Sequence, residues 1–263
     1  MNTSGILTRT HQWSSRLRVR ARRIGRASID LLFPPHCTFC GVALARCSTD
    51  ALLCCTCKSG LTPRLDQVCQ RCCASLPNHF IADKDCPHCR GRRFHFESVT
   101  SIGNYREQLR EAVLRLKLSV NEPLMWSMGR LLADRIRRTV SDFEARTLVS
   151  VPIHWTRRFS RGINQSEILT ASIAHALRIP AEDRLLVCRR KTKKQGTLGA
   201  AERTRNVKGA FAICSGFDVS GGRILLVDDV MTTGATASEV AKVCKKGGAA
   251  SVKVAVVARA TGV

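Results

Sequence analysis

The chain has 263 residues, enough for one large domain and one small one. Its 43 Lys and Arg against 20 Asp and Glu give a formal net charge of +23, which points to an anionic partner such as nucleic acid, a polyphosphate ligand or an acidic surface. Hydrophobic residues make up 44% of the chain, yet no stretch approaches the length of about 18 apolar residues that a membrane span needs. The sequence therefore predicts no transmembrane span, and its composition permits an aliphatic core.

The chain contains fourteen cysteines, and eleven of them lie between Cys37 and Cys89. A secreted disulfide framework would come with a signal peptide, and residues 1–30 lack the apolar run of one. Paired thiols in a reducing compartment are typical of metal sites. We therefore expect a cytoplasmic protein that binds metal through thiolates.

Residues 1–30 form a basic segment with seven arginines and one acidic residue, Asp30. We expect a flexible or partly helical arm. A basic helix with Trp13, Leu17 and Ile24 on one side, a disordered tail and an organelle transit peptide all fit this composition, so these alternatives stay open.

Residues 31–96 contain four Cys-x-x-Cys knuckles with matched spacing. Thirteen residues separate the first knuckle from the second, and thirteen separate the third from the fourth. Each knuckle places two thiolates on one side of a tetrahedral zinc ion, so two knuckles complete one site. The spacing predicts a small double zinc ribbon with two structural Zn²⁺ ions, bound by one set of Cys37, Cys40, Cys54 and Cys57 and a second set of Cys69, Cys72, Cys86 and Cys89.

Other interpretations of this cysteine-rich segment stay open. A crossed pairing would join the first knuckle to the third and the second to the fourth. Cys55 and Cys73 could compete as ligands, His36 or His88 could replace a thiolate, and a redox Cys-x-x-Cys is the rival function. If zinc holds the segment together, chelation should unfold it and leave the second domain largely intact.

Residues 97–263 change in character, because cysteine becomes rare and the periodicities of strands and helices alternate. This alternation predicts a doubly wound α/β domain with a parallel sheet. The expected strands are 98–105, 148–153, 224–227 and 252–258, and the expected helices are 109–118, 123–138, 164–177 and 235–246. Residues 184–211 are basic and predict a hairpin or a mobile loop.

The segment from Arg223 to Thr236 is the strongest functional signal. An apolar strand ends in Asp228 and Asp229, and a Thr/Gly turn then leads into a helix. Paired carboxylates can accept hydrogen bonds from a ribose diol, and the turn offers hydroxyls and backbone N–H groups to a phosphate at a helix N-terminus. The pattern predicts a sugar-phosphate pocket whose phosphate contacts come from Thr232, Thr233, Gly234, Ala235 (through its N–H) and Thr236.

A second candidate anion site follows the strand that ends near Ile153. It contains Arg157, Arg158 and Arg161, and then Gly162 before a helix that starts with Asn164 and Gln165. Arginine forks suit phosphate oxygens, and the two amides add neutral donors. The alternative is a solvated basic turn in which Asn164 is an ordinary helix N-cap.

These motifs resemble a known family. Ile224–Thr236 is similar to the phosphoribosyl-pyrophosphate (PRPP) motif of type I phosphoribosyltransferases. The order of double ribbon, Arg161–Gln165, Arg189/Arg190 with Gln195, Arg203 with Asn206, and the PRPP motif resembles the ComF family over roughly residues 31–258. Ile163 and Leu118 depart from the family pattern, at positions away from the expected phosphate contacts.

The resemblance implies a PRPP-binding, phosphoribosyltransferase-like protein tied to competence and DNA uptake, with Mg²⁺ bound alongside PRPP. Asp228 and Asp229 would hold the ribose, Arg157, Arg158 and Arg161 would steady the departing pyrophosphate, and the acceptor is not identified. A second hypothesis is a PRPP- or nucleotide-binding competence factor without turnover, which binds single-stranded DNA and interacts with competence or recombination proteins. The expected organisation is a basic arm (1–30), a double zinc ribbon (31–96) and a phosphoribosyltransferase-like domain (97–263).

Overall fold

The computed structural model describes residues 34–44, 51–65, 67–77, 86–139, 145–193 and 199–261. The predicted basic arm and Gln195 lie outside these residues. The chain divides into two compact units, Met1–Cys54 and Cys55–Val263. The domain boundaries expected from the sequence stay a prediction.

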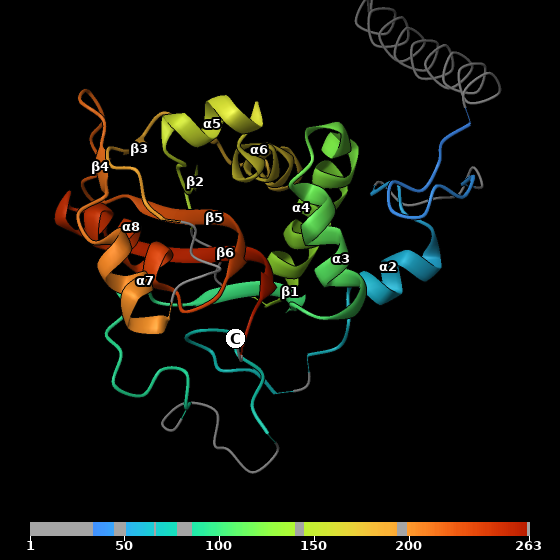
Figure 1. The fold of residues 1–263 in the computed structure, drawn as a ribbon, viewed down its shortest axis with the longest axis horizontal. Helices are drawn as coiled ribbons and strands as arrows, with labels where there is room; N and C mark the ends of the chain where they lie inside the picture. The colour runs from blue at the N-terminus through green and yellow to red at the C-terminus, as the bar shows by residue number, and fades with distance from the viewer. Residues whose placement is uncertain are drawn as a thin grey trace, which may run out of the picture. The chain divides into compact units, whose positions relative to one another are not determined.

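A four-stranded parallel sheet forms the centre of the larger unit (Figure 1). Its strands are β1 (Val99–Asn104), β2 (Thr147–Ser150), β5 (Arg223–Met231) and β6 (Ser251–Arg259), in the spatial order β1-β6-β5-β2. The two central strands are almost continuously apolar because helices cover both faces of the sheet. Leu226 pairs with Val254 at the middle of the sheet, and both are buried.

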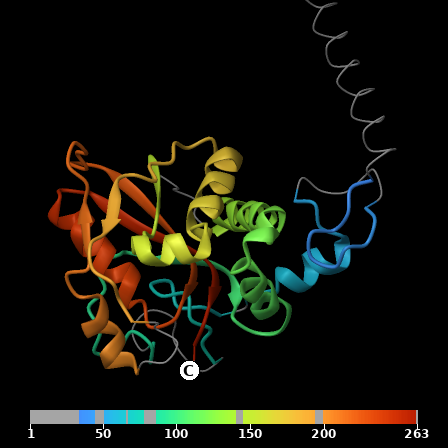
Figure 2. The same ribbon diagram turned by 45° about the horizontal axis from the view of Figure 1, so that its top comes forward.

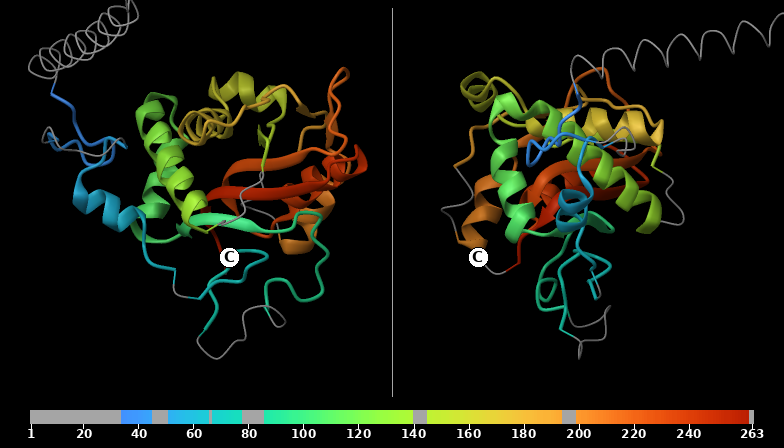
Figure 3. Two further views of the ribbon diagram at one scale, coloured as in Figure 1. Left: turned by 180° about the vertical axis from the view of Figure 1, so that it is seen from behind. Right: turned by 90° about the vertical axis from the view of Figure 1, so that its right-hand side faces the viewer.

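Helices lie on both sides of this sheet, as Figures 2 and 3 show. On one side are α3 (Glu107–Leu116), the short 3₁₀ turn η1 (Ser119–Asn121), α4 (Glu122–Thr139) and α6 (Gln165–Leu177). On the other side lies α8 (Ala235–Lys246), whose buried Val240 and Cys244 belong to the same hydrophobic core as Leu226 of β5. The prediction of a doubly wound parallel sheet is therefore confirmed.

Helices α4 and α6 pack closely because α4 has a glycine, Gly129, at the point of contact. A Cβ atom at Gly129 would come within 2.5 Å of the Ser172 Cβ, and Ser172 Oγ donates to the Trp126 carbonyl at 2.7 Å. This contact fixes α6, which carries part of the candidate site at its N-terminus.

Most expected elements are present, with shifts at their ends. Helix α8 has the predicted bounds and ends at Gly247, but β2 stops at Ser150, before the predicted end at Ile153. Pro152 has no N–H for a ladder, which explains the early stop. Strand β5 continues to Met231, so Asp228 and Asp229 lie within the strand rather than after it.

The basic segment 184–211 forms a hairpin that contains an additional helix. Strand β3 (Leu186–Cys188) pairs antiparallel with β4 (Phe211–Ile213), and α7 (Ala200–Val207) lies between them. Arg190 Nη2 donates to the carbonyls of Asn206 (2.9 Å) and Lys208 (3.0 Å). The Asn206 side chain in turn bonds both the N–H and the carbonyl of Lys193. These two residues of the resemblance motif thus hold the hairpin together.

The third and fourth knuckles belong to the same hydrophobic core as the sheet. Cys72 and Cys86 are buried in one cluster with Phe96, Val254 and Leu226. The short helix α2 (Cys55–Leu61) opens the larger unit. None of the helices in the described part of the chain combines the length and apolarity that a membrane crossing requires.

Candidate functional site

Two clusters of four cysteines are present, in the two sets predicted from the sequence. Within each set the sulfur atoms all lie within 4.8 Å of one another. The Sγ atoms of Cys69 and Cys89 are 3.7 Å apart, as are those of Cys72 and Cys86, and those of Cys40 and Cys54 are 3.8 Å apart. Zn–S bonds of about 2.3 Å in a tetrahedron put sulfurs about 3.8 Å apart, so both clusters are compatible with structural zinc.

The crossed pairing of knuckles and the substitute ligands are absent from these clusters. Among the described residues, Cys55, Cys73, His36 and His88 join neither set. Burial raises the pKa of the Cys73 thiol, which disfavours the thiolate that a metal ligand needs.

Asp228 and Asp229 lie at the carboxyl end of β5, where parallel sheets usually bind ligands. Asp228 Oδ1 accepts hydrogen bonds from Ser166 Oγ (3.1 Å) and from the Asp229 N–H (2.9 Å). Burial, and then the neighbouring charge of Asp229, raise the pKa of the Asp228 carboxyl well above its usual value. A carboxylate pair held in this way gains from any ligand that brings hydrogen-bond donors or positive charge.

The start of α6 lines the same cavity as Asp228 and Asp229. Asn164 is the N-cap: its Oδ1 accepts from the Ser166 N–H at 3.3 Å, and its Nδ2 donates to the Val151 carbonyl at 3.4 Å. The N-cap alternative therefore accounts for Asn164. Gln165 is only 4% exposed, and its Nε2 has no hydrogen-bond partner among the described residues. A buried amide without a partner is costly, so this donor suits a ligand oxygen in the cavity.

The three predicted arginines all belong to α5 (Trp155–Arg161), which His154 caps by accepting from the Thr156 N–H. Arg158 Nη1 lies 2.6 Å from Glu167 Oε1, and Arg158 does not line the cavity. The side chains of Arg157 and Arg161 lie outside the described residues. A role for these three in binding pyrophosphate stays a prediction.

The Thr/Gly turn leads from β5 into α8. Gly234, at the α8 N-cap, has φ +77°, which L side chains rarely adopt. A Cβ there would lie 3.1 Å from Phe94 Cε1. Thr232 and Thr236 line the cavity that contains Asp228 and Asp229, whereas Thr233 and Ala235 line a different one. Thr233 Oγ1 accepts from the Ala235 N–H at 3.4 Å.

A buried arginine holds this turn from below. Arg259, at the end of β6, is 2% exposed and donates through Nη1 to the carbonyls of Met231 (2.9 Å) and Thr232. These hydrogen bonds fix the backbone at the point where β5 ends and the Thr/Gly turn begins. Arg259 was not predicted, because an arginine at the end of an apolar strand gives no local sign of its partners.

Together these groups line a cavity of about 410 Å³, which we call the aspartate cavity. It has a size typical of small-molecule sites. Acidic, hydroxyl, amide and cationic groups all line it, a combination that suits a polyhydroxylated anion with a bound cation. Its lining includes Asp228, Asp229, Thr232, Thr236, Asn164, Gln165, Ser166, His154, Lys117 and Arg203. Ser166, which bonds Asp228 directly, was not predicted, since nothing in the sequence separates it from other helix-start serines.

Parts of this chain are similar to known proteins. The family model of the phosphoribosyl transferase domain matches residues 165–262. A purine phosphoribosyltransferase from Pyrococcus horikoshii of known structure is 19% identical, with a TM-score of 0.35 over 51% of this chain and 84% of that one. The domain match and the parallel sheet together show a type I phosphoribosyltransferase fold.

Two curated relatives are similar over a larger share of the chain. The DNA utilization protein YhgH of Salmonella typhi is 30% identical over 227 residues, which cover 85% of this chain and 96% of that protein. Competence protein F of Haemophilus influenzae is 29% identical over 179 residues, or 66% of this chain and 78% of that one. The chain therefore belongs to the ComF family, as a phosphoribosyltransferase-domain protein of the DNA-utilisation and competence type.

Proposed function

We propose that the aspartate cavity binds PRPP with Mg²⁺, and that the protein transfers the phosphoribosyl group to an acceptor in the course of DNA utilisation. The observation that carries the proposal is the pair Asp228 and Asp229, which lie at the end of a central strand and line a cavity together with the unpartnered Gln165 amide. Each of the two cysteine clusters would hold one structural Zn²⁺, and the compartment would be the cytoplasm.

In this proposal Asp228 and Asp229 hold the ribose hydroxyls, either by accepting hydrogen bonds from them or through a metal ion that the two carboxylates would bind. Mg²⁺ held there would offset the negative charge of PRPP. The 5′-phosphate lies at the N-terminus of α8, where backbone N–H groups and the helix dipole favour an anion. Thr232 and Thr236, which line the aspartate cavity, would supply side-chain contacts, and Thr233, Gly234 and Ala235 would contribute through the backbone of the turn.

The departing pyrophosphate needs positive charge as the C1′–O bond breaks. Arg157, Arg158 and Arg161 lie on α5, and Asn164 and Gln165 follow at the start of α6. An acceptor then attacks C1′ of the oxocarbenium-like centre from the opposite face. The site would work by positioning and electrostatic stabilisation, with no nucleophilic side chain.

Calorimetry with PRPP in the presence of Mg²⁺ tests the binding step. Asp228→Asn should weaken PRPP binding by about 1–3 kcal/mol, the scale of a lost charge-assisted hydrogen bond. Asp134→Asn is the matched control, because Asp134 forms an exposed ion pair with Arg137 on α4, away from the cavity. Equal PRPP affinity in wild type and Asp228→Asn would sink the assignment.

A second candidate is a PRPP- or nucleotide-binding competence factor that grips single-stranded DNA without turnover. It draws support from the names of the relatives, DNA utilization protein and competence protein, neither of which states a reaction. Competence or recombination proteins would then be partners. Pyrophosphate release from PRPP with one of a panel of bases and amines favours the transferase. No pyrophosphate release with any compound of the panel, together with strongly salt-dependent binding of single-stranded DNA, favours the binding protein.

A further inference from the structure

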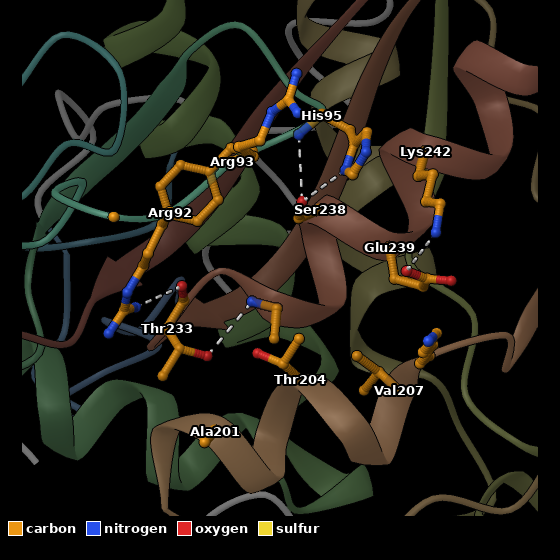
Figure 4. Close-up of a pocket in the computed structure, with 14 residues that line it drawn as sticks. Arg92, Arg93, His95, Ala201, Thr204, Val207, Thr233, Ser238, Glu239 and Lys242 are labelled. Atoms are coloured by element: carbon orange, nitrogen blue, oxygen red, sulfur yellow. Dashed lines mark hydrogen bonds and ion pairs between the residues drawn. The ribbon is translucent and has the colours of Figure 1, made fainter.

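A second cavity, of about 520 Å³, lies between α7, the start of α8 and residues 91–95 (Figure 4). Thr233 and Ala235 line it, whereas Asp228, Asp229, Thr232 and Thr236 line the aspartate cavity instead. The Thr/Gly turn thus has a different cavity on each side. We call this one the α7–α8 cavity.

Positive side chains dominate the α7–α8 cavity. Arg92, Arg93, Lys208 and Lys242 line it from three separate chain segments, against one carboxylate, Glu239. That carboxylate is already engaged: Glu239 Oε1 accepts from the Gly209 N–H at 2.9 Å, and its Oε2 lies 3.9 Å from Lys242 Nζ. The cavity therefore keeps a net positive charge that an anion would offset.

The remaining polar groups are those that phosphates use. Three hydroxyl side chains, Thr204, Thr233 and Ser238, line the cavity. Arg92 Nη1 donates to the Thr233 carbonyl at 3.2 Å, as Figure 4 shows, which holds one end of the guanidinium beside the first turn of α8. Arginine forks and hydroxyl donors at a helix start form a typical phosphate site.

The aromatic residues that line this cavity, Phe94 and His95, are already engaged and do not offer a free ring for a base to stack on. Phe94 already stacks on Phe96, with ring centroids 4.8 Å apart, and the Arg71 guanidinium lies 5.6 Å from the Phe94 centroid. His95 is tied to α8, because its Nδ1 lies 3.1 Å from Ser238 Oγ. Recognition in this cavity would therefore rest on phosphate groups rather than on base stacking.

We propose that the α7–α8 cavity is a second phosphate-binding site, separate from the aspartate cavity, for a small phosphorylated molecule of nucleotide size. Its volume is in the range of small-molecule sites. A ligand there would touch Thr204 of α7, Lys208 directly after α7 and Lys242 of α8. It would thereby brace the helix that also carries Arg203, which lines the aspartate cavity.

Calorimetry of the full chain with ADP, without added Mg²⁺, tests this site. The double variant Lys208→Gln/Lys242→Gln removes two lining cations and leaves Arg92 on its backbone partner. The matched control, Lys58→Gln/Lys246→Gln, removes the same charge from α2 and α8 outside the cavity. ADP affinity should fall about tenfold or more in the cavity variant and less than about twofold in the control, and adenosine should not bind.

The other outcomes overturn the proposal. An equal loss in both variants would mean that only the overall charge attracts ADP. A parallel loss of PRPP affinity in the cavity variant would make the cavity part of the PRPP pocket. Cavity-dependent binding of an octathymidylate but not of ADP would assign the phosphate groups to a nucleic-acid backbone instead of a small molecule. Circular dichroism of each variant confirms that it is folded.

Discussion

Arg259 Nε donates a 2.8 Å hydrogen bond to the carbonyl oxygen of Cys72, 187 residues earlier in the chain. The same guanidinium donates to the carbonyls of Met231 and Thr232, where the Thr/Gly turn begins. One buried side chain thus connects a knuckle of the second cysteine cluster to the backbone of the candidate phosphate turn. Because Arg259 contacts both the cluster and the turn, a structural change in one of them should alter the stability of the other.

Replacement of Arg259 tests this connection. Arg259→Met keeps the bulk of the side chain but leaves the buried carbonyls without their donor, so the free energy of unfolding should fall by about 3 kcal/mol. Urea unfolding measures the loss, with Arg110→Met as control, because Arg110 is exposed on α3. Hydrogen exchange should show faster exchange in residues 231–236 of Arg259→Met. Unchanged exchange there would separate the turn from Arg259.

Zinc removal should affect more than the ribbon itself. The sequence suggests that chelation leaves the second domain intact, but Cys72 and Cys86 pack in the same core as Leu226 and Val254. Cys86→Ser should therefore lower zinc content and also destabilise the sheet, since a structural zinc site can supply up to about 10 kcal/mol of folding free energy. Elemental analysis and thermal unfolding followed by tryptophan fluorescence measure the two effects.

The control for this change is Cys214→Ser, because Cys214 follows β4 and belongs to neither cluster. It should keep both zinc content and melting temperature. A Cys86→Ser variant that loses zinc yet melts like wild type would show that the second cluster folds independently of the sheet.

Gly234→Ala should cost stability for two separable reasons. The positive φ of +77° is one, and the 3.1 Å approach of the new Cβ to Phe94 is the other. Gly216 has a φ of +89°, and a methyl group there would meet nothing within 4 Å, so Gly216→Ala isolates the backbone cost of about 1 kcal/mol. Gly234→Ala should lose about 1 kcal/mol more in urea unfolding. Equal losses would show that Phe94 gives way.

The elements of the sheet were predictable because each is a strongly periodic or continuously apolar segment. Helix α8 has clear signals at both ends, Gly234 and Gly247, and its bounds were predicted correctly. The end of β2 was not, since the apolar Val151 and Ile153 continue the pattern past a proline that interrupts the ladder. Local pattern thus fixes the existence of an element more firmly than its end.

Contacts between segments that are distant in the chain could not be predicted from the sequence. The aspartate pair and the cysteine sets are close in sequence or regularly spaced, so their grouping could be inferred. The bonds of Ser166 to Asp228 and of Arg259 to Cys72 join residues 62 and 187 positions apart, and no local pattern marks them. Helix α7 was missed as well, because its basic composition gives the same signal as a solvated loop.

The raised pKa of Asp228 has a consequence for stability. The folded chain binds this proton more tightly than the unfolded chain, so ionised Asp228 destabilises the fold. The cost is present above the folded pKa and disappears as the pH falls below the unfolded value of about 4. Asp228→Asn removes the charge but keeps an oxygen that can accept from Ser166, so it should be more stable than wild type near neutral pH by on the order of 1 kcal/mol.

Urea unfolding of wild type and Asp228→Asn across a pH series measures this difference. The advantage of the variant should shrink as the pH is lowered toward about 4, because wild-type Asp228 then becomes neutral too. Asp134→Asn, at an exposed ion pair, should show no such advantage at neutral pH. A stability difference between Asp228→Asn and wild type that stays constant with pH would mean that Asp228 has the same pKa in the folded and unfolded chain. Ionised Asp228 would then not destabilise the fold.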